Sequence, residues 1–501
     1  MMQSFKSLRP SSIAPRLIPS LISKRNKFTS RLRSPIQAGQ PLHETRPNLL
    51  KPGELTPGIT ALEYFQRRHD LMGRLPLNSC LILQSNQVKY ASGAVFYPFQ
   101  QDNDFYYLTG WNEPDSIMIL ERTRKDETIF HMITPPKDAF AEQWEGFRTG
   151  EKGVKDIFNA DGSCSNSIAE WPSYLEKILK RNDTVYFDKQ MIKNSSHNPA
   201  HHKQICTVLQ INNKLDRLKT DAREIIAEMR KIKSDAELRV MRRAGQISGR
   251  SYNQAFGRRF RNERTLHSFL EYKFVSGGCD KSAYIPVVAS GSNSLCIHYT
   301  SNNDVMYDDE MVLVDASGAL GGYCSDISRT WPVNGEFTEP QKDLYSAVLN
   351  VQRKCIQLCK ASNNYSLQDI HNKSMEYMKE ELLNLGIPNA GNWEVDKLYP
   401  HYIGHNLGLD VHDVPQVSRF EPLKPGQVIT IEPGLYIPND TQFPDYFRNV
   451  GIRIEDDIAI HENSFTNLTI EAVKELPDLE SVMTGGSMTK MDEDVISPLD
   501  L

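Results

Sequence analysis

Several features that define common protein classes are missing from this 501-residue sequence. No apolar run approaches the roughly 20 residues that a membrane-spanning helix needs, so we expect no membrane span and leave peripheral association open. The eight cysteines form no CxxC pair and no small disulfide framework, which argues against structural zinc and fits a reducing compartment. No GxSxG motif occurs, which disfavours a serine hydrolase of the α/β type.

Acidic residues are absent from the first 43 positions, which hold eight of the 58 Lys and Arg residues. A basic, serine-rich and acid-free N-terminus is typical of a mitochondrial transit peptide. We therefore predict a disordered mitochondrial presequence over residues 1–40, with a basic disordered arm as the alternative. The other 50 basic residues face 63 acidic ones, a formal balance of −13, which argues against nucleic acid as the main partner.

The length favours two domains, and the composition, 39% hydrophobic and 24% charged, is that of a globular protein. From about residue 55 to 229, strand-like runs alternate with helix-like segments, which predicts an α/β domain. We interpret its aromatic segment at 105–111 as a core strand. A capping box at Ser234 and Glu237 predicts the start of a long helix just after the domain boundary. The predicted division is an N-terminal domain over 41–229, a second domain over 230–483 and a loose polar tail over 484–501.

An acid-bearing pattern of strands occurs twice in the second domain. In the first copy an apolar strand ends at Asp315, glycines form a turn, and the returning arm carries Asp326. In the second copy a strand ends at Glu432 and the returning strand carries Glu455. The first pair alone could equally be turn aspartates that bind backbone amides. The duplication instead predicts four carboxylates around a pseudo-twofold axis, and we infer a metal site because their burial without cations would be costly.

Histidines gather between the two copies. His401, His405 and His412 fall within twelve residues, and His298 precedes the first copy. A lone histidine is more often a core residue, but three beside four acids indicate a site. One imidazole with four carboxylates suits Mn²⁺ better than a sulfur-bound metal, with Zn²⁺, Co²⁺ or Fe²⁺ as substitutes in vitro, and four negative charges match two divalent ions.

One histidine and the four acids resemble, in order and in flanking sequence, the metal ligands of the pita-bread metallopeptidases: Asp315, Asp326, His405, Glu432 and Glu455. The HxxxHxxGLDVHD string from residue 401 and the EPGLY string from residue 432 are most similar to aminopeptidase P. From about residue 37 onward, the chain resembles the mitochondrial processing enzymes of that type. The resemblance implies an α/β (α+β) fold, in which a creatinase/aminopeptidase P-like domain precedes a pita-bread domain with an internal pseudo-twofold repeat.

The resemblance also implies a role for each candidate residue. His298 and His412 would donate hydrogen bonds to the substrate carbonyl and the oxyanion. Glu432, besides binding metal, would carry a proton from water to the leaving nitrogen. Three residues would position the substrate segment after the scissile bond: His401, Arg453 and Tyr436. Each of them could instead support the metal ligands through hydrogen bonds, and for Tyr436 the two roles are equally expected.

The implied activity is that of a dinuclear metalloaminopeptidase. It would remove one N-terminal residue from imported mitochondrial proteins after presequence cleavage, giving stabilised N-termini. The resemblance further implies a homodimer in the matrix or on the matrix face of the inner membrane, and it allows a nuclear pool. The rivals are a general Xaa-Pro aminopeptidase or dipeptidase of the same fold and, from another class, a catalytically dead pita-bread binding module. Methionine aminopeptidase is disfavoured by the large N-terminal domain.

Overall fold

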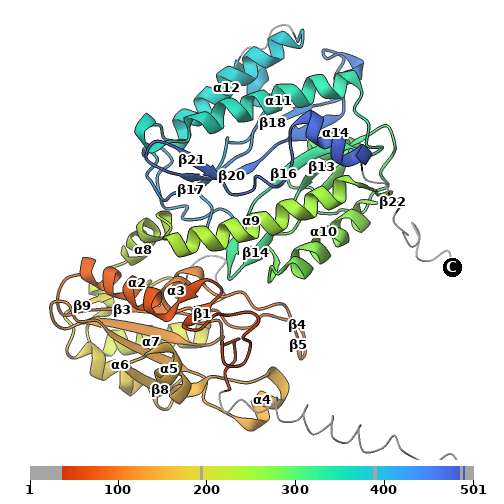
Figure 1. The fold of residues 1–501 in the computed structure, drawn as a ribbon. Coiled ribbons are helices and arrows are strands. Elements are labelled where there is room, and N and C mark those ends of the chain that lie inside the picture. The colour runs from red at the N-terminus through yellow and green to blue at the C-terminus, as the bar shows by residue number, and fades with distance from the viewer. Residues whose placement is uncertain (1–36, 192–195, 388–391, 486–488, 491–501) are drawn as a thin grey trace, which may run out of the picture.

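A computed structural model of the chain describes residues 37–191, 196–387, 392–485 and 489–490. Two domains lie one above the other in Figure 1, an N-terminal domain in red to yellow and a C-terminal domain in green to blue. Nearly all of the predicted presequence lies outside the described residues. Within the described ranges, no helix combines the length and the apolar character that crossing a membrane requires.

The N-terminal domain is a mixed five-stranded sheet with helices on both faces. Its elements are β1 (Glu54–Thr56), β2 (Ile59–Thr60), α2 (Ala61–Arg74), β3 (Ser79–Gln84), β4 (Tyr90–Ser92), β5 (Val95–Phe96), α3 (Asn103–Thr109), β6 (Ile117–Arg122), β7 (Ile129–Thr134), α4 (Ala139–Glu145), α5 (Gly150–Phe158), β8 (Gly162–Ser165), α6 (Trp171–Leu179), β9 (Thr184–Tyr186) and α7 (Pro199–Ile211). The strand order is β8-β7-β6-β3-β9. Because alternate residues of a strand face opposite ways, Met118 and Leu120 of β6 pack with α2 and α3, whereas Ile117 and Ile119 pack with α6 and α7.

The aromatic segment predicted as a core strand is instead the helix α3. The side chain of Asp102 caps its start by accepting a hydrogen bond from the Phe105 backbone N–H at 2.9 Å. Gly110 ends it with a φ of 66°, a conformation that glycine adopts easily. The strand prediction was wrong because a helix buried on nearly all sides shows no polar face, so only its caps reveal it.

A short helix, α8 (Ala222–Lys231), connects the domains, and the predicted domain boundary falls within it. The buried side chain of Arg230, near the end of this helix, joins the two domains through ion pairs. Its guanidinium contacts Asp104 of α3 at 2.7 Å, and it contacts Asp410 and Asp413, which follow the histidine stretch, at 2.7 and 2.6 Å. The loop that carries His412 is therefore tied to the N-terminal domain.

The C-terminal domain places strands between two layers of helices (Figure 1). Its elements are α9 (Asp235–Phe256), β10 (Arg258–Arg259), α10 (Glu263–Gly277), β11 (Lys281–Ser282), β12 (Val287–Ser290), η3 (Gly291–Leu295), β13 (Met311–Asp315), β14 (Gly318–Leu320), β15 (Tyr323–Cys324), β16 (Ser328–Pro332), α11 (Glu339–Leu358), α12 (Leu367–Asn384), α13 (Asn392–Leu398), β17 (Val428–Ile431), β18 (Gly434–Ile437), β19 (Val450–Arg453), β20 (Asp456–Ile460), β21 (Phe465–Asn467), α14 (Leu476–Gly485) and β22 (Thr489–Lys490). The predicted capping box at Ser234 and Glu237 is present at the start of α9.

The predicted repeat is present as two copies of one unit. In the first copy β13 pairs with β16 and encloses the hairpin β14–β15, and in the second β17 pairs with β20 and encloses the hairpin β18–β19. Each acid of the candidate site lies where an outer strand meets the inner hairpin. The two copies therefore bring corresponding acids to corresponding positions.

Two glycines on α9 let the chain after β21 lie directly against this helix. A Cβ atom at Gly245 would lie 2.4 Å from the Leu468 carbonyl oxygen, and one at Gly249 would lie 2.6 Å from the Ala472 nitrogen. Only glycine fits at such distances from backbone atoms. Farther along, α14 includes residues 484–485, and β22 pairs with β10, so these parts of the predicted loose tail are ordered elements. Residues 491–501 lie outside the described ranges.

Candidate metal centre

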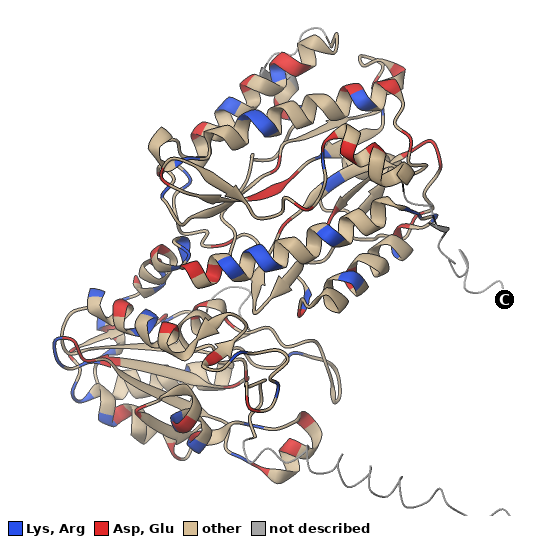
Figure 2. Cartoon of the chain, viewed as in Figure 1, with Lys and Arg blue, Asp and Glu red and all other residues tan. Residues whose placement is uncertain are grey.

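The five predicted ligands converge between the two copies of the repeat. His405 Nε2 lies 3.6 Å from Asp326 Oδ2 and 3.5 Å from Glu432 Oε1. Asp326, His405 and Glu455 each offer a ligand atom, and these atoms lie within 4.8 Å of one another. In Figure 2, acidic residues lie at the centre of this domain among the strands, and Lys and Arg lie mainly on its helices.

Asp315 joins this cluster through a tyrosine. The Tyr284 hydroxyl lies 2.6 Å from Asp315 Oδ1 and 2.5 Å from Asp326 Oδ1. Asp326 and Glu455 are buried, with 4% and 1% of their surface exposed, whereas the side chains of Asp315 and Glu432 are 18% and 17% exposed. The site is therefore closed on one side and open on the other, where a substrate can enter.

Burial and mutual repulsion raise the pKa values of three carboxyl groups in this cluster. Burial raises the pKa of Asp326 well above its ordinary value, and the neighbouring Asp315 raises it further. Burial and Asp326 have the same effect on the pKa of Glu455. Burial raises the pKa of Glu432 to about 8, although Arg453 opposes the shift. Without cations the cluster must therefore hold protons, which divalent ions would displace.

His405 presents the lone pair that a metal ligand needs. Its Nδ1 lies 3.0 Å from the Asn406 carbonyl oxygen, which can only accept, so Nδ1 carries the proton and Nε2 is free. Burial, with a contribution from His412, lowers the pKa of His405 to about 4, so the ring is neutral at pH 7. The free Nε2 lies 3.6 and 3.5 Å from two carboxylate oxygens, separations close to those of atoms that bind the same metal ion at about 2.0–2.2 Å.

The two oxygens of Glu455 differ in their hydrogen bonds, and this difference indicates whether the site fits a metal ion. Glu455 Oε2 accepts a hydrogen bond from Ser328 Oγ at 2.7 Å. Glu455 Oε1 is buried and has no hydrogen-bond partner among the described residues. Buried carboxylate oxygens are normally satisfied, so this atom needs a ligand of another kind. The donor set and its unpartnered oxygen fit divalent cations.

The three residues predicted to position substrate form one chain of contacts that starts at Asp315. Arg453 donates to Asp315 Oδ2 at 2.7 Å and to the Tyr436 hydroxyl at 2.8 Å. The Tyr436 hydroxyl lies 2.9 Å from His401 Nε2, and His401 Nδ1 lies 2.9 Å from the Tyr402 carbonyl oxygen. Nδ1 therefore carries the proton, and Tyr436 donates to Nε2. Burial and Arg453 lower the pKa of His401 to about 3, which keeps this ring neutral.

The two histidines predicted to contact the substrate carbonyl lie at the open side. The ring of His412 is 4.4 Å from that of His405, centroid to centroid. Partial burial lowers the pKa of His412, and the nearby His298 lowers it further. His298 lies on the loop that follows η3, and both rings are exposed. The structure thus gathers all the predicted site residues in one region.

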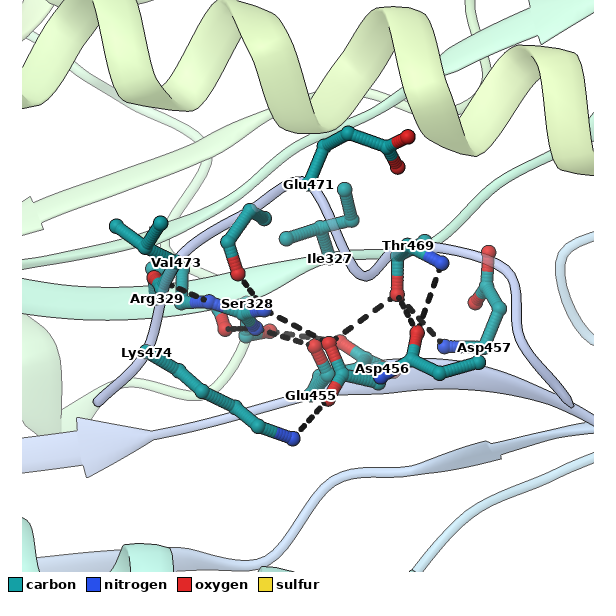
Figure 3. Close-up of polar contacts among 12 residues, drawn as sticks. Ile327, Ser328, Arg329, Glu455, Asp456, Asp457, Thr469, Glu471, Val473 and Lys474 are labelled. Atoms are coloured by element: carbon teal, nitrogen blue, oxygen red, sulfur yellow. Dashed lines mark hydrogen bonds and ion pairs between the residues drawn. The ribbon is translucent and has the colours of Figure 1, made fainter. Parts of the chain in front are cut away.

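Sequence reasoning missed Tyr284 and Arg329. Arg329 is fully buried, and its Nη1 donates to the carbonyl oxygens of Ser328 and Glu455 at 2.9 and 2.5 Å, while Nη2 donates to Asp456 Oδ1 at 2.7 Å (Figure 3). It thus links the end of the first copy of the repeat to the second. Neither residue belongs to a repeated pattern, so no spacing in the sequence indicates them.

Two family models match the chain. One, described as Metallopeptidase family M24, matches residues 239–462, and the other, described as Aminopeptidase P, N-terminal domain, matches residues 64–186. The chain belongs to metallopeptidase family M24. This membership and the geometry of the centre confirm the predicted fold class and the predicted enzyme class, a hydrolase of the aminopeptidase P type with a site for divalent metal.

The relatives agree over nearly the whole chain. Intermediate cleaving peptidase 55 of Saccharomyces cerevisiae is 66% identical over 95% of this chain and 94% of its own length. Human Xaa-Pro aminopeptidase 3 is 35% identical over 95% of this chain and 99% of its own length. Among solved structures, the Saccharomyces protein without its N-terminal 58 residues matches with a TM-score of 0.80 and 65% identity, covering 87% of this chain and 100% of that one. Escherichia coli aminopeptidase P matches with a TM-score of 0.80, 31% identity, and coverage of 86% and 100%.

Proposed function

We propose that this M24 metallopeptidase removes a single N-terminal residue from proteins imported into mitochondria, after their presequences have been cleaved. The convergence of one unprotonated imidazole nitrogen and four carboxylates carries the proposal, because such a set of ligands would suit two divalent ions. The name of the Saccharomyces relative, an intermediate cleaving peptidase, supports the substrate class.

Five residues would hold the ions: Asp315, Asp326, His405, Glu432 and Glu455. Four carboxylates and one imidazole favour Mn²⁺, a metal that binds oxygen-rich sites. A Zn-substituted form of Escherichia coli aminopeptidase P exists, so other divalent ions occupy the site of that relative. Bound ions would lower the pKa of a water molecule and polarise the scissile carbonyl.

The residues of this chain would then handle protons and developing charge. Glu432 is partly exposed and would take a proton from water and deliver it to the leaving nitrogen. His298 and His412 would donate N–H groups to the substrate carbonyl oxygen as its negative charge develops. A neutral ring suffices for this role, and the lowered pKa of His412 keeps that ring neutral at pH 7.

Arg453, Tyr436 and His401 would hold the peptide segment after the cut. Their mutual hydrogen bonds fix the orientation of each ring and of the guanidinium. Arg453 also pairs with Asp315, so the same contacts support the metal ligand from behind. The substrate's free amino group would be attracted to the carboxylate cluster, which favours cleavage at chain ends.

Peptide substrates separate this proposal from its nearest rival, a general Xaa-Pro aminopeptidase, which the name of the 35% identical human relative favours. The Mn²⁺-loaded protein should release Tyr, Leu or Phe from peptides without proline at the second position. Rapid cleavage of Xaa-Pro peptides together with no cleavage of these would overturn the processing role. Absence of any cleavage by the metal-loaded protein would favour the catalytically dead binding module instead.

The processing role also requires a mitochondrial location, in the matrix or on the matrix face of the inner membrane. We propose that residues 1–40 act as the presequence, since they are basic and free of acids. Deletion of these residues should abolish import into isolated mitochondria, and import of the truncated chain would contradict the assignment. A nuclear pool would appear as signal from the full-length protein in purified nuclei.

A homodimer is the proposed assembly, and exposed aromatic side chains of the N-terminal domain support it. Phe140 and Trp144 of α4 are 73% and 70% exposed, and Phe96 of β5 is 54% exposed. Exposed aromatic patches commonly mark interfaces. Sedimentation should give a dimer for the wild type and a monomer for Trp144→Glu, and a monomeric wild type would contradict the assembly.

A further inference from the structure

A buried carboxylate that no step above uses lies at the start of α10. Glu263 has none of its surface exposed. It accepts five hydrogen bonds, at 2.8 to 3.1 Å: at Oε1 from Ser290 N, Ser290 Oγ and Asn293 Nδ2, and at Oε2 from Tyr299 Oη and Asp304 N. Charge-assisted hydrogen bonds of this kind are stronger than those between neutral groups.

The donors share one feature, since all of them belong to residues 290–304, which are the end of β12, η3 and the chain after it and are called here the loop at 290–304. Ser290 and Asn293 lie at its beginning, and Tyr299 and Asp304 lie at its end. Glu263 therefore closes this loop by binding both of its ends with one side chain. His298, an exposed residue, lies between them and directly precedes Tyr299.

Three further hydrogen bonds fix the same loop to β12, to the residue before β12 and to β19. Asn302 accepts a hydrogen bond from Val288 N of β12 and donates to the Pro286 carbonyl oxygen, both at 2.8 Å. Ser294 Oγ accepts from Gly451 N of β19 at 2.9 Å. A Cβ atom at position 451 would lie 2.4 Å from the Ser294 carbonyl oxygen, so the loop lies directly against β19.

We propose that Glu263 is a positioning residue for His298, acting through the loop at 290–304, and this rests on the proposed role of His298 in the reaction. Few contacts of its own hold an exposed histidine, so its position depends on the loop backbone. Glu263 fixes that backbone on both sides of His298. Loss of this hydrogen-bond acceptor would let the imidazole move away from the substrate carbonyl oxygen and leave the metal ligands in place.

The test compares Glu263→Gln, His298→Ala and the double variant as full-length, metal-loaded proteins. Glutamine keeps the size of the side chain and one acceptor oxygen, but its amide nitrogen cannot accept the hydrogen bond from Asp304 N. The measurements are kcat and KM on a peptide beginning with Leu, metal content by mass spectrometry, and Tm. Glu113→Gln is the matched control, because this buried carboxylate also holds a loop, through Gly39 N and Thr149 N, in the other domain.

Glu263→Gln should lower kcat by about tenfold to a hundredfold, the range expected for a misplaced catalytic group. KM and metal content should stay close to wild type. In the His298→Ala background the same change should lower kcat by less than about twofold, because its effect passes through His298. Glu113→Gln should lower Tm and leave kcat unchanged.

Equal losses of kcat from Glu263→Gln in both backgrounds would overturn the proposal, as would an unchanged kcat in the single variant. If Glu263→Gln fails to fold, Tyr299→Phe removes only one of the five donors and should lower kcat severalfold in the wild type but not in His298→Ala. An inactive wild type would instead contradict the proposed function. An active His298→Ala variant with wild-type kcat would contradict the role of His298 on which the proposal rests.

Discussion

Glu455 and Asp456 are adjacent in sequence and equally buried, yet their surroundings differ completely (Figure 3). Asp456 accepts hydrogen bonds from Arg329, Lys474 and Gln352, and the two cations hold its pKa far below the usual range despite burial. Glu455 has one unpartnered oxygen, and burial with neighbouring acids raises its pKa. The protein pairs Asp456 with its own cations, whereas Glu455 forms no ion pair among the described residues and only the charge of Arg453 partly offsets its neighbouring acids.

Asp456 has a charge that serves the fold, whereas Glu455 has one that would serve the metal centre. A buried acid that serves the fold is neutralised by side chains that fold with it. Glu455, a predicted metal ligand, faces other acids and forms no ion pair among the described residues, so bound ions would balance its charge. Burial alone therefore does not distinguish Glu455 from Asp456, whereas the charge of their nearest partners does.

The strongest test of the contrast removes the functional carboxylate. Glu455→Gln should lower kcat/KM by about a thousandfold or more, roughly 4 kcal/mol in the barrier, because the ions that polarise the substrate are lost. Metal content should fall, while Tm of the metal-free protein should stay the same or rise, because one buried repelling acid is gone. Retention of both ions and of full activity would contradict the assignment of Glu455.

The reverse test removes the structural carboxylate. Asp456→Asn leaves Arg329 and Lys474 without their buried counter-charge and should lower the free energy of unfolding by about 3–5 kcal/mol. Denaturant unfolding of the metal-loaded protein measures this change. The double variant Asp456→Asn/Lys474→Met should recover part of the loss, and equal stability of the single variant and wild type would show that the cluster is not structural.

The pH dependence of the metal-free protein sharpens the contrast. The pKa of Glu432 is raised from 4.5 to about 8, so between these values the folded state binds more protons than the unfolded state. Stability of the metal-free protein should therefore fall as pH rises from about 4.5 to 8. Bound ions displace these protons, so the Tm difference between loaded and chelated protein should widen over this window. A constant Tm difference would contradict the raised pKa.

The smallest effect is expected from an ion pair at the edge of the same region. Arg242 pairs with Glu471, and their side chains are 32% and 21% exposed. Arg242→Gln should lower the free energy of unfolding by under about 1 kcal/mol, since solvent screens the pair, and kcat should not change. A loss as large as that of Asp456→Asn would show that exposure does not separate the two pairs.

The sequence indicated which acids lie together in the structure, because these acids occur in a repeated pattern. Asp315 and Asp326 alone were ambiguous, and Glu432 with Glu455 resolved the ambiguity by repeating the scheme of strand, acid and turn. Both copies have the predicted pairing of outer strands. The inner hairpins were not anticipated, since each contains very short strands.

Sequence analysis did not identify residues that belong to no motif or repeat. Tyr284 bridges two acids and Arg329 joins the two copies, but an isolated tyrosine or arginine has no spacing that marks it. The helix α3 was predicted to be a strand because aromatic residues, which favour strands, dominate its composition. Asp102 and Gly110, which cap its two ends, are residues typical of helix termini. Contacts between distant segments place Tyr284 and Arg329, whereas α3 had a local signal in its caps.

The glycines of α9 have a consequence for how this protein tolerates change. Gly245 and Gly249 let the backbone around Ala472 lie against the helix, and the Ala472 carbonyl oxygen accepts a hydrogen bond from Arg329 at 2.6 Å. A single added methyl group at one of these positions of α9 would therefore push on the backbone that binds Arg329, and Arg329 supports Glu455. Substitutions at these two glycines should therefore make the enzyme heat-sensitive, although they change none of the predicted metal ligands.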